Sequence, residues 1–289
     1  MSIGQLNIYG KDKVQVAIER IKAFEPEDGY FLAFSGGKDS VVVKALADMA
    51  EVKYDAHYNL TTVDPPELVQ FIKREYPDVI FEKQHWKHDG VFVKAGDPVT
   101  MWNLIPEKLL PPTRVARYCC QHLKEQTGIG RFVITGVRWA ESVNRAKKRA
   151  GLEIADGKTT QREHSDPDNP DQELIHICMQ KTQKILNPII DWTEYEVWEF
   201  IKTYNVAYCK LYDEGFPRLG CIGCPMAGKH RVEEFERWPK VKQAYLRAFE
   251  RMLKAKDIKG SPNPEWKTGE DVYKWWIGQY RGGREDETD

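Results

Sequence analysis

An apolar run that ends in a pair of glycines constrains the fold of this chain more than any other feature. Residues 30–34 read YFLAF, and they lie between the turn cluster EPEDG and the sequence SGGKDS. A short, almost wholly apolar run bounded by turn residues is typical of a strand buried on both faces of a parallel sheet. The next residues, SVVVKALADMA, predict a helix. The chain is therefore expected to pass from a buried strand into a helix through Ser35-Gly36-Gly37.

The same alternation of strand and helix continues along the chain. Residues 53–60, 78–82 and 131–136 are expected strands, and PPELVQFIKREYP is an expected helix with prolines in its first turn. Strands that alternate with helices favour right-handed crossovers and a parallel sheet. We predict an α/β protein with an open, mostly parallel sheet flanked by helices and a helical C-terminal extension.

Other stretches are less regular in pattern. Helices are expected over residues 11–24, 192–204 (with Thr193 as N-cap and Trp198 packed into the core) and 232–254. Residues 87–118 predict a loop with short helices, and the polar residues 151–172 predict an irregular loop. In the aromatic segment that contains Trp275 and Trp276, core packing is the preferred interpretation. The final REDETD predicts a disordered tail.

Composition narrows the class of protein. Of 289 residues, 41% are hydrophobic and 30% charged, and the formal net charge of −1 shows no overall basic excess that would indicate nucleic acid. No window approaches 18 apolar residues, and the N-terminus lacks the apolar stretch of a signal peptide. The expected location is cytoplasmic, with no membrane partner. Six cysteines in such a compartment indicate metal ligands or chemistry before disulfides.

The sequence SGGKDS has the composition of an anion-binding turn. Glycines let backbone N–H groups converge on an anion, and the following helix N-terminus adds partial positive charge. Ser35 and Ser40 offer hydroxyl groups, Lys38 offers a point charge, and Asp39 is suited to hold Mg²⁺ or to orient the turn. The turn is neither the GxxxxGK[ST] of a Walker loop nor a GxGxxG. A plain strand-to-helix turn is the alternative.

Four cysteines have the spacing of a metal or cluster site. Cys119 and Cys120 are adjacent, and Cys221 and Cys224 are separated by two residues in RLGCIGCP. The second pair can face one centre, whereas adjacent side chains normally diverge. Spacing alone leaves three interpretations open: a four-thiolate zinc, a 4Fe-4S cluster, and buried free thiols.

The motifs together resemble a known family. SGGKDS resembles the PP-loop of the ATP pyrophosphatase superfamily, and the tandem CC with a distant CxxCP is similar to the cluster-binding phosphoadenylyl-sulfate/adenylyl-sulfate reductase family. TGVRWAES at residues 135–142, NPIIDW at 187–192, and LYDEG at 211–215 fit the same family. The resemblance implies an adenine nucleotide alpha hydrolase-like fold, with a helical lead-in over 1–28, a PP-loop domain over 29–230 and an extension over 231–289.

The resemblance also assigns residues. It implies that ATP, or an adenylyl sulfate, binds with Mg²⁺, and that a 4Fe-4S cluster lies near the substrate. A strand end before Gly136 lies at the sheet edge where ligands bind, and Arg138 and Arg145 are suited to pair with phosphate or sulfate oxygens. The expected nucleotide-binding residues are Ser35, Gly36, Gly37, Lys38, Asp39, Ser40, Gly136, Arg138, Glu141 and Arg145. Lys38, Asp39 and Arg138 are the expected catalytic residues, and Cys119, Cys120, Cys221 and Cys224 the expected cluster ligands.

One family feature is missing. Adenylyl-sulfate reductases carry a nucleophilic cysteine in an ECGxH-like tail motif, whereas the residues after Cys224 contain no cysteine. Without that thiolate the usual thiosulfonate intermediate cannot form. Cys178 and Cys209 are spare, and Cys209, near the cluster segment, is the better candidate to carry sulfur.

Three functions are consistent with these motifs. The leading one resembles the sulfur-incorporation (DndC/SspD-like) branch of DNA phosphorothioation, in which ATP is cleaved to AMP and pyrophosphate and a cysteine desulfurase supplies sulfur. The basic residues 145–149 with Lys87, Lys94 and Arg114 are then a candidate DNA path. The second is an adenylyl-sulfate or phosphoadenylyl-sulfate reductase that uses an external thiol. The third is a non-catalytic sensor of nucleotide or redox state. DNA and a second copy of the chain (a homo-oligomer) are further candidate partners.

Overall fold

The computed structural model describes residues 12–141, 146–147, 149–155, 160–163, 183–262 and 264–278. Contacts within the chain divide it into two compact units, and each unit is built from stretches that are distant in sequence. Unit 1 combines residues 1–58, 67–81 and 128–219, and unit 2 combines residues 59–66, 82–127 and 220–289. The domain limits expected at residues 28 and 230 stay a prediction, as does the disordered tail, which falls outside the described residues.

A mostly parallel sheet forms the centre of unit 1. Its strands lie in the order β3-β2-β1-β4-β7-β5-β6. Strand β1 pairs in parallel with β2 and β4, and β4 pairs in parallel with β7, whereas β5 is antiparallel to both β7 and β6. The strands are β1 Tyr30–Ala33, β2 Tyr54–Asn59, β3 Ile80–Glu82, β4 Phe132–Ile134, β5 Leu152–Ala155, β6 Thr160–Glu163 and β7 Gln183–Leu186. The predicted fold class, an open α/β sheet with a helical extension, is confirmed.

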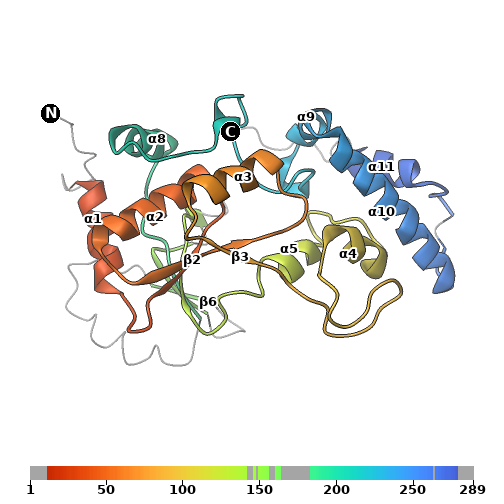
Figure 1. Cartoon of the computed structure of the whole chain (residues 1–289), viewed down its shortest axis with the longest axis horizontal. Helices are drawn as coiled ribbons and strands as arrows, with labels where there is room; N and C mark the ends of the chain where they lie inside the picture. Colours follow the sequence, from red (N-terminus) through yellow and green to blue (C-terminus); the bar gives the residue numbers. More distant parts are fainter. Residues whose placement is uncertain are drawn as a thin grey trace. The chain divides into compact units, whose positions relative to one another are not determined.

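Helices cover the sheet of unit 1. Figure 1 shows α2 and α3 crossing the strands β2 and β3 on one face. The buried side chains of α2 include three consecutive valines, residues 41–43, and Leu46, which explains why an almost wholly apolar sequence forms this helix. Helix α8 begins with the expected cap, because the hydroxyl of Thr193 accepts the N–H of Glu196 and the Glu196 side chain accepts the N–H of Thr193. The helices are α1 Lys13–Ala23, α2 Lys38–Ala50, α3 Pro66–Glu75 and α8 Glu194–Thr203.

The strand order places a switch point at β1. Strand β2 lies on one side of β1 and β4 on the other, so the chain leaves β1 in one direction and later returns to its opposite side. In open parallel sheets, ligands bind at the carboxyl ends of strands at such a point. The glycine turn follows β1 directly, and Thr135-Gly136 follows β4 directly. The two motifs that were chosen from the sequence therefore meet at the position where this fold binds ligands.

The structure corrects three expectations. Residues 152–155 and 160–163 form strands β5 and β6 rather than an irregular loop, because Leu152 pairs with Leu186 of β7 and with Glu163; residues 164–172 lie outside the described part. The helix expected over 232–254 is two helices, α9 His230–Arg237 and α10 Pro239–Ile258, since proline is tolerated only in a first turn. Trp198 is half-buried, and the core residue of its segment is Trp192, 1% exposed.

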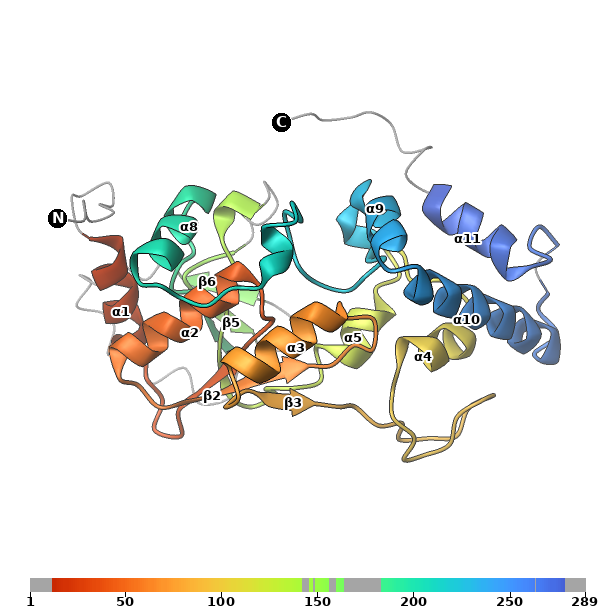
Figure 2. The same cartoon turned by 45° about the horizontal axis from the view of Figure 1, so that its top comes forward.

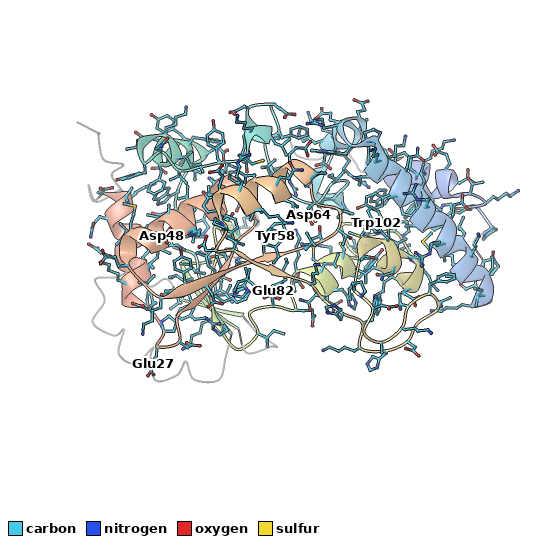
Figure 3. All side chains as sticks on the ribbon, in the orientation of Figure 1. Glu27, Asp48, Tyr58, Asp64, Glu82 and Trp102 are labelled. Atoms are coloured by element: carbon cyan, nitrogen blue, oxygen red, sulfur yellow. The ribbon has the colours of Figure 1, made fainter. Side chains whose placement is uncertain are left out.

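Unit 2 is built from helices. They are α4 Met101–Lys108, α5 Tyr118–Leu123, α9, α10 and α11 Gly269–Gly278. Helix α10 packs on both α4 and α11, as Figure 2 shows. Trp102 of α4 is labelled in Figure 3. Its ring meets that of Tyr245 of α10 edge-on, with ring centroids 5.2 Å apart. Trp276 is fully buried against Tyr245 and Phe249, so the C-terminal extension is part of this core.

In the described part of the chain, no helix combines the length and the apolar character that crossing a bilayer requires.

Candidate functional site

The glycine turn after β1 has a fixed shape. Gly36 has φ +71°, and a Cβ atom there would lie 2.7 Å from Ile72 Cδ1 and 2.8 Å from Leu68 Cδ1 of α3. Both the backbone conformation and the close approach of α3 therefore require glycine. The hydroxyl of Ser35 donates to that of Ser40 at 3.1 Å, and the Ser40 hydroxyl donates to the carbonyl of Gly37 at 2.9 Å. The two serines chosen as anion ligands hold the turn together in this structure.

The N-terminus of α2 has an acceptor supplied from far along the chain. Gly37 is the N-cap and gives no side-chain cap, but the N–H of Lys38 donates to the hydroxyl of Tyr212 at 2.9 Å. The ammonium of Lys38 also lies 5.6 Å from the centre of the Tyr212 ring. Tyr212 was not among the expected site residues; its position in LYDEG, one of the family segments, was the available signal. Its hydroxyl occupies the kind of place where a helix N-terminus holds an anion oxygen.

Four charged side chains form a network beside the turn. Arg138 donates from Nε to Asp39 Oδ1 at 2.6 Å and from Nη2 to Glu194 Oε2 at 2.8 Å. Lys38 Nζ lies 3.5 Å from Asp39 Oδ2 and 3.4 Å from Glu194 Oε1. Two cations and two carboxylates thus alternate, and their formal charges cancel. Glu194 was not predicted, because its link to the site exists only through α8.

Arg138 is the most buried member of this network. Its side chain is 2% exposed, and its third nitrogen, Nη1, donates to the carbonyl of Trp192 at 3.2 Å. All three guanidinium nitrogens therefore have partners within unit 1. The arrangement makes Arg138 the fixed point that orients both carboxylates, and its expected role in binding phosphate stays a prediction.

The two carboxylates differ in how easily they ionise. Burial raises the pKa of Asp39 above its ordinary value, and the positive charges of Lys38 and Arg138 only partly oppose this. Burial also acts to raise the pKa of Glu194, but the hydrogen bond from Arg138 and the charge of Lys38 outweigh it and hold that pKa below its ordinary value. Ionised Asp39 would therefore gain most from an additional cation.

The lowered pKa of Glu194 predicts a pH-dependent contribution to stability. The ionised carboxylate stabilises the fold above its ordinary pKa of 4.5, and this contribution is lost as the pH falls through the lower value of the folded state. Relative to Glu194→Gln, the unsubstituted chain should therefore lose stability as the pH is lowered from 5 to about 3. Urea unfolding of both proteins at several pH values measures the difference. A difference that stayed constant over this range would contradict the assignment.

The segment after β4 packs directly against the start of α2. A Cβ atom on Gly136 would lie 2.9 Å from both the carbonyl carbon and the carbonyl oxygen of Asp39, so only glycine allows this approach. The carboxylate of Glu141 accepts the N–H of Arg138 at 2.9 Å, which fixes the turn that carries Arg138. The hydroxyl of Thr135 is hydrogen-bonded to the side chain of Asn187. Asn187 is a third residue, after Tyr212 and Glu194, whose place in the site was not predicted.

Nine of the ten expected nucleotide-binding residues therefore lie at the carboxyl ends of β1 and β4 in unit 1, and Arg145 lies outside the described residues. The nine are Ser35, Gly36, Gly37, Lys38, Asp39, Ser40, Gly136, Arg138 and Glu141.

The four expected cluster ligands all belong to unit 2. Cys119 and Cys120 lie on α5, and Cys221 and Cys224 lie in the turn that precedes the short 3-10 helix Pro225–Ala227. The C-terminal extension shapes this turn. The buried carboxylate of Glu234 accepts the N–H of Gly223 at 2.7 Å, and the hydroxyl of Tyr245 donates to the carbonyl of Ile222 at 3.1 Å. Helices α9 and α10 thus hold the CIGC backbone in place.

The cysteines influence one another electrostatically. A hydrogen bond with Cys119 and the guanidinium of Arg117, which lies 3.3 Å from the Cys120 sulfur, lower the pKa of Cys120 to about 5. The pKa of Cys119 is raised, first by that hydrogen bond, then by burial and by negative charge on Cys120, Cys221 and Cys224. The sulfur of Cys221 donates to the hydroxyl of Thr61 at 3.4 Å, and its charge raises the pKa of Lys124. All four thiols share one electrostatic environment.

The donor chemistry fits a soft cationic group, but a coordination shell is not formed. Within the described ranges, no group of three or more His, Cys, Asp or Glu side chains is arranged to hold a metal ion. Thiolates are the ligands that zinc and iron–sulfur clusters prefer, and Arg117 and Lys124 offset part of their negative charge. Adjacent residues on a helix point about 100° apart, which suits a wide cluster better than a single ion. The 4Fe-4S cluster stays a prediction.

The remaining candidates for sulfur chemistry and DNA contact are less favourable. Cys209 is 2% exposed in unit 1, and burial raises the pKa of its thiol, so it behaves as a core residue rather than a nucleophile. Cys178 lies outside the described residues. In the basic stretch, Arg149 forms an ion pair with the buried Glu153 at 2.7 Å, which gives it a structural role; Arg145 and Lys148 are not described.

The fold and the first site define a class. An open parallel sheet whose glycine turn, helix N-terminus and charge network meet at the switch point is a nucleotide-binding α/β domain. More specifically, the chain belongs to the phosphoadenosine phosphosulfate reductase domain family, whose sequence profile matches residues 29–227. The predicted family is thereby confirmed, and the match ends before α9.

The chain is similar to several known proteins. An uncharacterized protein of Methanocaldococcus jannaschii is 29% identical over 205 residues, which are 68% of this chain and 41% of the relative. The adenosine 5'-phosphosulfate reductase of Oceanobacillus iheyensis is 26% identical over 194 residues, 62% of this chain and 60% of the relative. The chain thus spans less than two thirds of either. Among solved structures, the crystal structure of phosphoadenylyl-sulfate reductase from Candida auris in complex with phosphate aligns with this chain with a TM-score of 0.42 and 13% sequence identity. The alignment covers 71% of this chain and 87% of the Candida auris chain.

Proposed function

We propose that the chain is a PP-loop ATP pyrophosphatase that acts in sulfur transfer and activates a nucleic-acid phosphate for phosphorothioate formation, as in the DndC/SspD-like branch. The observation that supports it best is the network of Lys38, Asp39, Arg138 and Glu194 at the switch point. Its charges are balanced without a ligand, so it can exchange partners when a triphosphate arrives. The glycine turn and the N-terminus of α2 lie directly beside it.

On this proposal, each residue of the site has a role that follows from its position. Phosphate oxygens compete for Lys38, which in this structure is shared between two carboxylates at 3.4 and 3.5 Å. Asp39 and Glu194 are then suited to hold Mg²⁺, which neutralises charge on the phosphates when bound. Arg138 keeps both carboxylates oriented and, on this proposal, acts chiefly by positioning. A phosphate oxygen replaces the hydroxyl of Tyr212 as the acceptor of the Lys38 N–H.

The proposed reaction balances in three steps. An oxygen of the acceptor phosphate attacks the α-phosphorus of ATP, the bond between the α and β phosphates breaks, and pyrophosphate leaves with its electron pair. A persulfide sulfur from a cysteine desulfurase then attacks the acceptor phosphorus and displaces AMP. A thiol reductant finally cleaves the sulfur–sulfur bond and leaves sulfur on the acceptor. In this proposal Cys119, Cys120, Cys221 and Cys224 hold a 4Fe-4S cluster, which supplies a redox centre when bound.

A reductase of adenylyl sulfate or phosphoadenylyl sulfate that uses an external thiol is the second candidate. The family itself and the Oceanobacillus relative favour it. Against it stands the sequence over residues 225–289, where α9, α10 and α11 lie and no cysteine occurs to act as the nucleophile of the reductase reaction.

Substrate and product distinguish the candidates. Anaerobically purified protein should release pyrophosphate from ATP with Mg²⁺, whereas release of sulfite from an adenylyl sulfate would support the reductase. Nucleotide binding without turnover, with desulfurase, thiol and DNA all present, would support a sensor. Absorption in the visible iron–sulfur band, with iron and zinc analysis, identifies the metal.

Lys38→Ala tests the nucleotide site. Removing the only ammonium of the network should lower turnover by about 10²–10³-fold, because the phosphates lose a preorganised positive charge. Iron content should stay unchanged, since the four cysteines belong to the other unit. Lys22→Ala, at an exposed position on α1, is the control and should retain full turnover. A loss of iron in Lys38→Ala would show that the two sites are not separate.

A further inference from the structure

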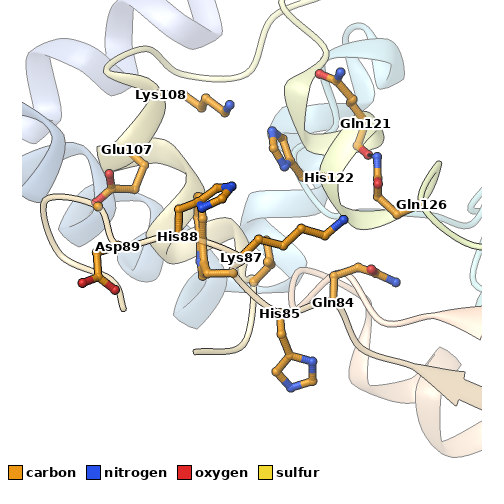
Figure 4. A pocket seen from close by; sticks show the side chains of 13 residues that line it. Gln84, His85, Lys87, His88, Asp89, Glu107, Lys108, Gln121, His122 and Gln126 are labelled. Carbon is orange, nitrogen blue, oxygen red and sulfur yellow. Dashed lines mark hydrogen bonds between the residues drawn. The ribbon is translucent and has the colours of Figure 1, made fainter. Parts of the chain in front are cut away.

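A pocket in unit 2, lined by several charged and carboxamide side chains, lies outside both sites described above. It has a volume of about 340 Å³, within the range of about 300–1,000 Å³ that is usual for small-ligand sites. One wall is the segment of residues 84–90 that follows β3, and another is the face of α5 that carries Gln121 and His122. Figure 4 shows Lys87, His88 and Lys108 directed toward the space in front of His122 and Gln126.

The two lysines of this pocket, Lys87 and Lys108, have no direct ion-pair partner and no side-chain hydrogen bond in the described part of the chain. The two carboxylates of the lining are otherwise engaged: Glu107 accepts the N–H groups of Val91 and Phe92 at 3.0 and 2.7 Å, and Asp89 accepts that of Ala95 at 2.8 Å. They hold the wall in shape, while the two ammonium groups remain available to an anion.

The rest of the lining suits a planar polar group. Trp86 and His122 both line the pocket, with ring centroids 6.2 Å apart. The indole N–H of Trp86 is buried, and among the described residues it has no hydrogen-bond partner. Gln84 and Gln121 add carboxamides, which both donate and accept hydrogen bonds. A ligand that combines an anion, an aromatic face and a polar edge would use all of these features.

We propose that this pocket binds one nucleotide unit, with its phosphate at Lys87 and Lys108 and its base against Trp86 and the carboxamides. Nucleotide phosphates are recognised by lysine ammonium groups, and bases stack on aromatic side chains at about 1–3 kcal/mol for each base. The unit could be a free nucleotide or part of a single strand, and the same chemistry serves both. The proposal holds whether the glycine turn cleaves ATP or an adenylyl sulfate, because it rests on different residues.

Fluorescence anisotropy with a labelled ten-residue oligothymidylate tests the proposal, with thymidine 3',5'-bisphosphate and inorganic phosphate as competitors. These probes lack adenine, and the same titrations with Lys38→Ala separate any phosphate binding at the glycine turn from binding in the pocket. The Lys87→Gln/Lys108→Gln variant should bind the oligonucleotide about tenfold or more weakly, and the slope of log K against log salt should fall by about 0.7, since the two lysines hold one phosphate and each phosphate contact on a single strand contributes about 0.7. Lys22→Gln/Lys202→Gln, at exposed positions of unit 1, makes the same change in net charge and should bind normally.

The competitors separate the two sources of the ligand. Displacement by the bisphosphate at concentrations far below those of inorganic phosphate supports a nucleotide site, and oligonucleotide binding much tighter than the bisphosphate identifies a strand. Trp86→Phe should retain binding better than Trp86→Ala, because phenylalanine keeps an aromatic face. Absence of binding, an equal loss in the control variant, or equal competition by inorganic phosphate would overturn the proposal. Turnover of Lys38→Ala is measured separately, so failure of one proposal is distinguishable from failure of the other.

Discussion

An Arg138→Ala variant is expected to unfold with a free energy about 3–5 kcal/mol below that of the unsubstituted chain. The substitution leaves Asp39 and Glu194 without their shared partner and the carbonyl of Trp192 without a donor. Because the side chain is 2% exposed, water cannot easily replace these contacts. Breaking a buried pair by removing one partner is costly for this reason. Urea unfolding followed by circular dichroism measures the change.

Two further variants make this result specific. Arg74→Ala removes an arginine of α3 whose ion pair with Glu75 is exposed, and it should change the free energy of unfolding by less than about 1 kcal/mol. Arg138→Lys keeps the charge but cannot reach Asp39, Glu194 and Trp192 together, so it should recover only part of the loss. If Arg138→Ala were no less stable than Arg74→Ala, the network would not be a structural feature of unit 1.

A Gly223→Ala variant is expected to destabilise unit 2 more than alanine at Gly96, Gly228 or Gly260 does. These three glycines also have positive φ, but a Cβ atom there would meet nothing within 4 Å. Gly223 has φ +72°, and a Cβ atom there would lie 2.4 Å from Cζ of Phe235. The left-handed backbone costs roughly 1–2 kcal/mol for alanine, and displacing the buried ring adds about 1–3 kcal/mol. The CIGC turn should shift, and the iron content of the purified protein should fall with it.

Gly260→Ala separates the two contributions. Gly260 has φ +65° but no atom within 4 Å of a Cβ position, so alanine there meets only the backbone cost. The difference between the two variants in thermal unfolding therefore reports the contact with Phe235. Adding Phe235→Leu to Gly223→Ala should restore part of the stability and of the iron content. Equal destabilisation by Gly223→Ala and Gly260→Ala would mean that the ring of Phe235 does not constrain the turn.

The second experiment also reaches a residue beyond the family boundary, Phe235, which contacts Gly223 from α9. Arg138 lies within residues 29–227, which match the family, whereas Phe235 and Glu234 lie on α9 beyond it. Glu234 and Tyr245 hold the backbone of the CIGC turn through Gly223 and Ile222. We therefore expect the C-terminal helices to be needed for any metal or cluster at the cysteines.

The sequence by itself determined the parts of the site that depend on neighbours along the chain. The run YFLAF predicted β1, and SGGKDS predicted the turn and the start of α2, because short-range sterics of glycine and the apolar pattern of a buried strand do not need the rest of the fold. The cap of α8 at Thr193 was predicted for the same reason. Family motifs then placed Gly136 and Arg138 after β4.

Only the tertiary structure decided which side chains meet. Tyr212 reaches the N–H of Lys38 across 174 residues, and Arg138 finds Glu194 across 56 residues. Strand β5 forms because β7 offers an edge to pair with, and β6 pairs with β5 in turn. Gly223 is constrained by the ring of Phe235 on α9. Such contacts depend on how elements distant in sequence pack together, and a local sequence pattern carries no information about the free energy of that packing. For this reason the charge network and the support of the cysteine turn became visible only in the folded chain.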